Sequence, residues 1–203
     1  MEEIQECAAH FLKLVNTTSY IFHMANKKLH IVSLDFSLKD FQHLAGLHYL
    51  YDLSIPKDKK KTIDWILNSD KPITDEYLAK SEFYKGRQND EKDVEKRIRE
   101  LRHLEKYLDE NNFIRIYSPK DSPENNSLII CDYIIESQLK GKGTVVYIFL
   151  KHRKGVESPC CIVSFVVKKN ISYGGQNLYW MRKEKIVSGI SSILYQNPGY
   201  VLS

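Results

Sequence analysis

The sequence predicts an α+β fold, in which an N-terminal hairpin and helices pack on a C-terminal antiparallel sheet of four to five strands. Up to about residue 112 the apolar side chains recur mostly at helical spacing, and after it they form short β-rich runs between turn clusters. The chain has 203 residues, 42% of them hydrophobic and 28% charged, which is typical of a globular protein with a sizeable core.

The individual elements follow from spacing, capping and turn signals. Residues 90–110 carry apolar side chains three and four apart and predict one long amphipathic helix. Ser37, with Asp40 at the third position, predicts a capped helix start. The predicted helices span residues 2–16, 38–53, 59–68, 74–80 and 90–110. The predicted strands span residues 20–24, 29–35, 113–117, 128–136, 144–151, 160–168 and 178–181.

These elements suggest one main domain with two short appendages. We expect an N-terminal helix at residues 1–18, a single α+β domain at residues 19–185 and a C-terminal tail at residues 186–203. The N-terminus is too polar for a signal peptide, and no apolar run has the roughly 18 residues of a membrane span. The four cysteines form no C-x-x-C pair, which favours reduced thiols in a cytoplasmic protein without contact to a membrane.

Positive charge is concentrated late in the chain. Between residues 138 and 185 ten Lys or Arg stand against two acids, a local charge of +8 that leaves −4 for the rest. Such asymmetry indicates a polyanion partner, although turn lysines that keep a sheet soluble would give the same count. Tyr173, Tyr179 and Trp180 lie in or near this window and either stack on bases or belong to the core. The candidate RNA-binding residues are Lys140, Lys142, His152, Arg153, Lys154, Lys168 and Lys169.

Two histidines in the segment 38–53 are candidates for chemistry. His43 and His48 are five residues apart, so on an undistorted helix they project about 140° apart and do not share a pocket. His48 falls on the apolar stripe and is expected in the core, whereas His43 lies beside Gly46, where another backbone or a ligand can approach. No histidine pair has the spacing of a zinc site, so we expect neither metal nor cofactor.

The order of several short motifs resembles a known family. Its most specific part is F-x-H-L-x-G-L-H at residues 41–48, followed by Arg97-Ile98, Cys131-Asp132-Tyr133, Tyr147–Lys151 and Ser164-Phe165. This series, from about residue 20 to 182, is similar to the fourth of the phage-associated barnase–EndoU–colicin–RelE-like nuclease families. The resemblance implies helices on a four-stranded antiparallel sheet, as in RelE-like folds, and a toxin-like RNA-cleaving role in phage or mobile-element conflict.

The corresponding hypothesis is a metal-independent endoribonuclease in which the RNA 2′-hydroxyl attacks the adjacent phosphorus. His43 is the first choice for acid or base, with His48 as its alternative, and Ser164, expected to face the same way as Ile162 and Val166, would position a phosphate oxygen. The full expected catalytic set is His43, Arg97, Tyr133, Lys151 and Ser164, with Arg97 and Lys151 stabilising charge and Tyr133 supplying a second proton.

Two other readings stay open. One is a non-catalytic antagonist that binds RNA or a host or phage protein with the same fold. The other is a ribonuclease of the helical HEPN type, because Arg97 and His103 match its R-x5-H spacing. The expected partners are RNA, such as tRNA or mRNA, and an antitoxin or immunity protein.

Overall fold

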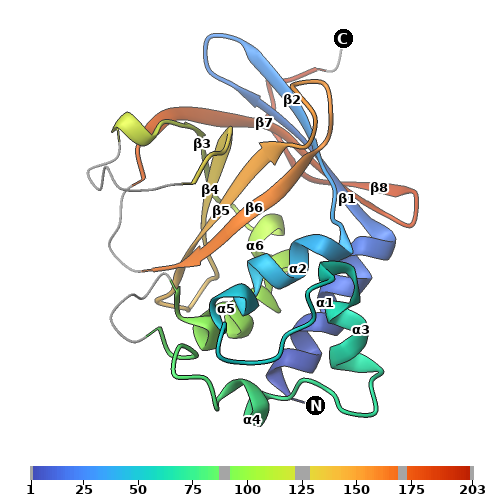
Figure 1. Cartoon of the computed structure of the whole chain (residues 1–203). Coiled ribbons are helices and arrows are strands. Elements are labelled where there is room, and N and C mark those ends of the chain that lie inside the picture. The colour runs from blue at the N-terminus through green and yellow to red at the C-terminus, as the bar shows by residue number, and fades with distance from the viewer. Residues whose placement is uncertain (1, 87–91, 122–128, 169–172, 202–203) are drawn as a thin grey trace.

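The structure is a computed structural model that describes residues 2–86, 92–121, 129–168 and 173–201 (Figure 1). Its helices are α1 Glu3–Thr17, α2 Leu38–Leu44, α3 Thr62–Leu67, α4 Asp75–Leu78, α5 Val94–Leu101 and α6 Leu104–Asp109, with short 3-10 turns η1 Leu47–Tyr49, η2 Lys59–Lys61 and η4 Pro119–Asp121. Its strands are β1 Thr18–Ala25, β2 Leu29–Leu34, β3 Phe113–Tyr117, β4 Tyr133–Gln138, β5 Val145–His152, β6 Cys160–Val167, β7 Gly175–Val187 and β8 Ile190–Gln196.

Seven of the strands close into a barrel, with β8 added to the outside of β7. The strand order is β1-β2-β6-β5-β4-β3-β7-β8, and β1 also pairs with β7, which joins the two ends. All neighbours are antiparallel except β2 and β6, which meet as a parallel pair only at Leu34 and Cys160. Helices on an open sheet of four to five strands is therefore the wrong architecture for this chain.

The long strand β7 explains why the sheet closes. Its first residues, 175–178, pair with β3, whereas residues 179–187 pair with the N-terminal strand β1. The predicted strand at residues 178–181 is only the middle of β7. The segment expected as a C-terminal tail forms the end of β7 and all of β8, which pair as a hairpin. Local patterns predict hairpins one at a time and do not show that the first hairpin joins the last.

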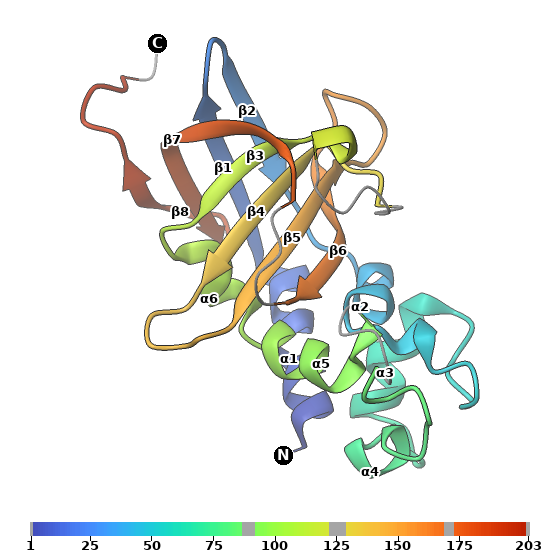
Figure 2. The same cartoon turned by 90° about the vertical axis from the view of Figure 1, so that its left-hand side faces the viewer.

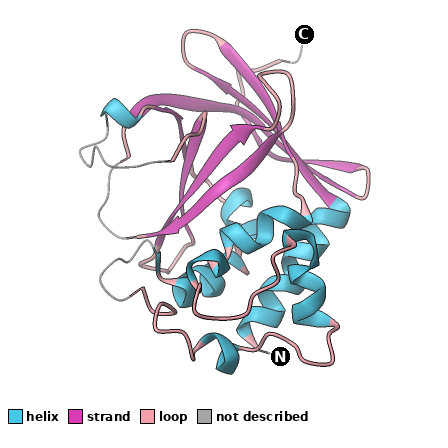
Figure 3. Cartoon of the chain, viewed as in Figure 1, coloured by secondary structure: helices cyan, strands magenta, loops and turns pink. Residues whose placement is uncertain are grey.

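The helices gather at one end of the barrel (Figures 2 and 3). They share one hydrophobic core with the barrel interior, in which Phe11 of α1 contacts Phe41 of α2, and Tyr107 of α6 contacts Phe165 of β6. A second buried cluster, formed by Tyr117, Ile134, Tyr147, Phe149, Val166 and Tyr173, lies apart from that core.

Two predicted helices are shorter than their patterns suggested. The helix expected at residues 90–110 breaks after Leu101 into α5 and α6, and Arg102 at the break pairs with Glu3 and Glu6 of α1. The helix expected at residues 38–53 ends at Leu44. The predicted capping box at its start is present, because the Ser37 amide donates to the Asp40 carboxylate over 3.1 Å.

Candidate functional site

A glycine turn after α2 brings the two histidines together. Gly46 has φ +77°, a left-handed conformation that glycine adopts without steric cost, and the chain then enters the 3-10 turn η1. This reversal stacks the His48 ring on the His43 ring, with centroids 4.3 Å apart and planes 20° from parallel. The expectations that the two rings point apart and that His48 is buried are both wrong, since they assumed a helix through Gly46 and His48 is exposed.

Arg97 enters the same site from α5. It is 2% exposed, and its Cδ would lie 2.9 Å from a Cβ placed on Gly46, so the glycine leaves room for the arginine to cross the turn. Its guanidinium lies 5.3 Å from the centre of the Tyr49 ring, and that ring is 3.9 Å from the ring of His48. His43, His48, Tyr49 and Arg97 thus form one continuous cluster.

The electrostatics of the cluster favour uncharged imidazoles. Burial lowers the pKa of His43, and the charges of Arg97 and Lys59 lower it further, while the Val163 backbone and Asp40 act in the opposite direction. His48 is exposed overall, but desolvation of its ring where it contacts His43 and Tyr49 lowers the pKa of His48 to about 4, with His43 and Arg97 adding to the effect. His48 is therefore available as a proton acceptor near neutral pH, and the pKa of His43 is shifted in the same direction.

The His43 ring contacts the Val163 backbone at the edge of β6 that helix α2 covers. This strand pairs with β5 along its length but with β2 only at Cys160, so its other edge beyond that point is not covered by a strand. Helix α2 packs against β6 there, and the His43 ring hydrogen-bonds to the Val163 backbone. Because this bond raises the pKa of His43, the ring donates and the carbonyl accepts.

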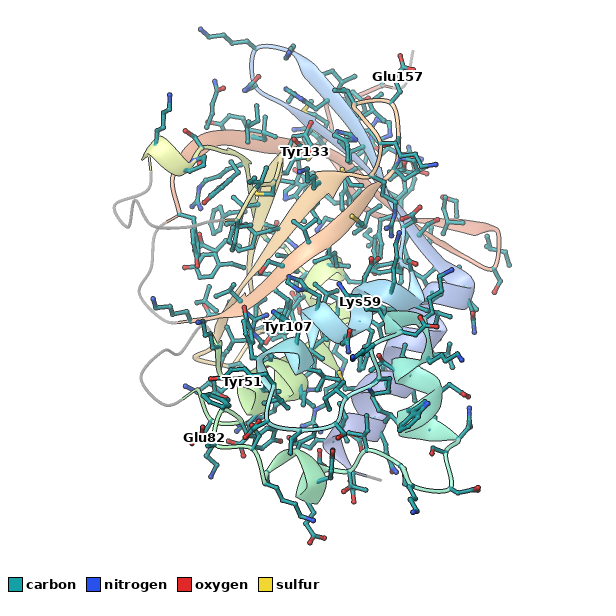
Figure 4. The ribbon with its side chains drawn as sticks, viewed as in Figure 1. Tyr51, Lys59, Glu82, Tyr107, Tyr133 and Glu157 are labelled. Atoms are coloured by element: carbon teal, nitrogen blue, oxygen red, sulfur yellow. The ribbon has the colours of Figure 1, made fainter. Side chains whose placement is uncertain are left out.

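A run of exposed lysines flanks the histidines. Turn η2 packs against α2 and carries Lys59, whose charge acts on both His43 and His48. Figure 4 shows Lys59 beside α2. Lys57, Lys60 and Lys61 are exposed on the same segment. We call His43, His48, Tyr49, Lys59 and Arg97 the His43 cluster. The charge count along the sequence missed Lys59 because its segment lies outside the basic window.

Tyr133 lies in a different part of the barrel. It begins β4 and is buried, and its hydroxyl is 3.4 Å from Nδ1 of His30. Strands β5 and β6 lie between β4 and the edge that α2 covers, a width of about 10 Å at ordinary strand spacing. Figure 4 shows Tyr133 in the upper barrel, away from Lys59.

Lys151 lies on β5 and Ser164 lies on β6, and the strand register gives the direction of each side chain. Lys151 follows the core residue Leu150 on β5, so it faces away from the core, and its charge acts on Cys131. Ser164 pairs with Phe149, whereas Ile162 pairs with Leu150, because a bulge shifts the register between them. Ser164 therefore does not share the face of Ile162, which corrects the expectation from simple alternation.

At least three of the expected RNA-binding residues have side-chain partners within the protein. Arg153 donates to Asp35 over 2.6 Å and to Asp40 over 2.8 Å, and Lys142 pairs with Glu100 over 3.2 Å. The other members are His152, whose ring contacts the Ser158 carbonyl, the exposed Lys140 and Lys154, the half-buried Lys168, and Lys169, which lies outside the described residues.

Arg97 and His103, the catalytic pair of the helical HEPN alternative, lie in two different parts of the structure. His103 lies at the break between α5 and α6 and lines a cavity of about 160 Å³ with His10, Arg102 and Lys106. Burial lowers the pKa of His103, and the charges that add to the shift come from Lys142, Arg102 and Lys106, with no contribution from Arg97. The R-x5-H spacing therefore does not assemble a site here.

The described ranges contain neither a group of metal ligands nor a membrane-spanning helix. Over residues 2–86, 92–121, 129–168 and 173–201, no three His, Cys, Asp or Glu side chains are grouped as metal ligands would be. In the same ranges no helix is both long enough and apolar enough to cross a membrane.

The comparisons with known proteins give one match. The sequence pattern of the family described as phage-Barnase-EndoU-ColicinE5/D-RelE like nuclease 4 matches residues 3–197. No curated protein and no solved structure matches the chain. The match covers nearly the whole chain, including α1, the His43 cluster and all eight strands. The chain belongs to this family of phage-associated, nuclease-like proteins.

Proposed function

We propose that the protein is a metal-independent endoribonuclease whose active site is the His43 cluster. In this reaction the RNA 2′-oxygen bonds to the adjacent phosphorus and the bond from phosphorus to the 5′-oxygen breaks, which yields a 2′,3′-cyclic phosphate and a free 5′-hydroxyl. The reaction needs a base, an acid and a cation beside the phosphorane. The observation that carries the proposal is the meeting of His43, His48 and Arg97 around the Gly46 turn.

The stacked histidines suit the two proton transfers. At a centroid separation of 4.3 Å, a proton on one ring disfavours a proton on the other, so the pair titrates as a unit. His43 takes the first proton, because the pKa of His48 is lowered to about 4, whereas at His43 the Val163 carbonyl and Asp40 offset part of the lowering by burial, Arg97 and Lys59. Neutral His48 then accepts the proton of the 2′-hydroxyl, and protonated His43 gives its proton to the departing 5′-oxygen.

The cations around the pair complete the proposed site. Arg97 stabilises the charge that develops on the phosphorane, since its planar guanidinium matches two phosphate oxygens. Lys59 and the neighbouring exposed lysines hold the flanking phosphates. This mechanism gives no role to Tyr133, which lies on β4 two strands from the edge that α2 covers, or to Lys151, which faces away from the core. Ser164 follows Val163 directly but faces the side of Phe149.

The test is RNA cleavage by the purified protein in the presence of EDTA. We expect fragments with 2′,3′-cyclic phosphate ends from total RNA or a tRNA pool, and a loss of at least 100-fold in His43→Ala and in His48→Ala. His103→Ala is the control, since it lies in the other cavity and should cleave normally. Cleavage lost in His103→Ala but kept in His43→Ala would contradict the proposal. RNA binding without cleavage by the wild type would favour the non-catalytic antagonist.

The proposal includes a toxin-like role in phage or mobile-element conflict, which the family assignment supports. Expression from a repressible promoter in a bacterial host should arrest growth for the wild type and not for His43→Ala. Equal growth of the two strains at equal protein levels would contradict this role. An antitoxin that binds across the His43 cluster should restore growth when it is expressed together with the wild type.

A further inference from the structure

Tyr51 is an aromatic ring presented to solvent close to the His43 cluster. It is 75% exposed, and its ring packs against the ring of Phe83, with centroids 4.1 Å apart and planes 36° from parallel. Figure 4 shows Tyr51 beside Glu82, at the edge of the helical end of the molecule. A large aromatic side chain exposed to this extent contributes little to folding.

The backbone around Tyr51 is held in place by its neighbours. The Asp52 carboxylate accepts from the Ser81 hydroxyl over 2.6 Å and from the Glu82 amide over 3.0 Å. Leu50, on the other side, is buried in the core. The ring is therefore positioned before any ligand binds, which lowers the entropy cost of stacking on it.

Two chain connections join Tyr51 to the His43 cluster. Tyr51 follows His48 by three residues, so their Cα atoms are at most about 11 Å apart. The second connection runs through Tyr84, which is next to Phe83 and whose carbonyl accepts from the Val94 amide over 3.0 Å. Val94 lies 3.4 Å from a Cβ placed on Gly46 and begins the helix that carries Arg97.

We infer that Tyr51 is a stacking platform for an unpaired nucleobase next to the cleaved phosphate, and that the substrate is single-stranded RNA. The inference rests on the proposed function for the identity of the ligand. Exposed aromatic faces hold single-stranded nucleic acid by stacking on its bases, because every base offers a π-face. Bases inside an A-form duplex are stacked on each other and do not reach such a platform.

The experiment measures binding of a single-stranded RNA oligonucleotide, 2′-O-methylated to prevent cleavage, with the fluorescent base 2-aminopurine at successive positions. In the wild type we expect quenching at one position, and in Tyr51→Ala we expect that quenching to disappear and affinity to fall about tenfold. Tyr51→Trp and Tyr51→Phe should restore both. Tyr51→Leu keeps an apolar contact with Phe83 but has no π-face, so it should behave like Tyr51→Ala.

Tyr179→Ala is the matched control, since Tyr179 is 70% exposed on β7 and lies in the region where the sequence also suggested base stacking. Normal binding by Tyr51→Ala, recovery in Tyr51→Leu, or quenching that depends on Tyr179 would each overturn the inference, as would an oligonucleotide that does not bind. Tyr51-dependent quenching without any cleavage would support the platform and remove the proposed catalysis. Cleavage that needs His43 but not Tyr51 would support the proposed catalysis and overturn the stacking platform.

Discussion

Two regions rich in basic residues differ in what surrounds their charges. In the window of residues 138–185, Arg153 and Lys142 are paired with carboxylates, and Lys185 pairs with Glu105 and Asp109. At the His43 cluster, Arg97 and Lys59 act on histidines and their charges lower both imidazole pKa values. A count of charge along the chain does not show that the fold pairs Arg153, Lys142 and Lys185 with carboxylates.

The largest expected effect is on Arg97. Arg97→Ala should lower cleavage by at least 100-fold, because the phosphorane loses its guanidinium. Arg97→Lys keeps the charge but not the planar fork and should recover only part of the activity. Cleavage in EDTA measures both, and thermal unfolding checks the fold, since Arg97 is buried. Arg99→Ala, an exposed change on the same helix, is the control, and equal losses in both variants would mean that the site is elsewhere.

A second change tests the turn that creates the cluster. Gly46→Ala should destabilise the protein by about 1–2 kcal/mol through the left-handed backbone alone. It should also push Arg97 aside and lower activity about tenfold or more, because the new Cβ lies 2.9 Å from the Arg97 Cδ. Gly189→Ala is a matched control, with φ +82° and no atom within 4 Å of the new Cβ. Equal activity of the two variants would show that Gly46 is needed only for its backbone.

A third pair of changes compares the two basic regions directly. Arg153→Ala should lower the free energy of unfolding by about 1–2 kcal/mol, since Asp35 and Asp40 lose their partner, and should leave RNA affinity unchanged. Lys59→Ala should do the opposite, with weaker RNA binding and a salt dependence reduced by about one counterion. Denaturant unfolding and filter binding at several salt concentrations measure the two quantities. The reverse pattern would indicate that RNA binds to the basic window at residues 138–185.

The smallest expected effect is on the pH dependence of stability. The pKa of His48 is about 4 in the folded state and about 6.5 in the unfolded state, so between these values the unfolded chain binds the extra proton. The free energy of unfolding should therefore fall as the pH drops from about 6.5 to about 4. His48→Gln should flatten this part of the curve relative to the wild type, as measured by denaturant unfolding at each pH. Parallel curves would mean that His48 titrates normally in the fold.

The features that depend on near neighbours in the chain could be predicted from the sequence. The apolar spacing of α1, the capping box of Ser37 and Asp40 and the β1–β2 hairpin act over a few residues, and all are present. The motif at residues 41–48, together with the motifs that follow it along the chain, indicated the family, and it contains His43, Gly46 and His48. Even there, the pattern did not show that the chain reverses at Gly46, because a glycine inside an apolar stripe is also compatible with a continuous helix.

The way in which distant segments meet depends on the tertiary structure. Closure of the barrel needs residues 18–25 to pair with residues 179–187, and Arg153 finds its carboxylate partner 118 residues away. Such contacts depend on which surfaces are buried together, and no local period records that choice. The same reason places Tyr133 two strands from the edge that α2 covers and brings Arg97 of α5 to the turn after α2. The residue types of the His43 cluster were visible in the sequence, whereas their grouping was set by the fold.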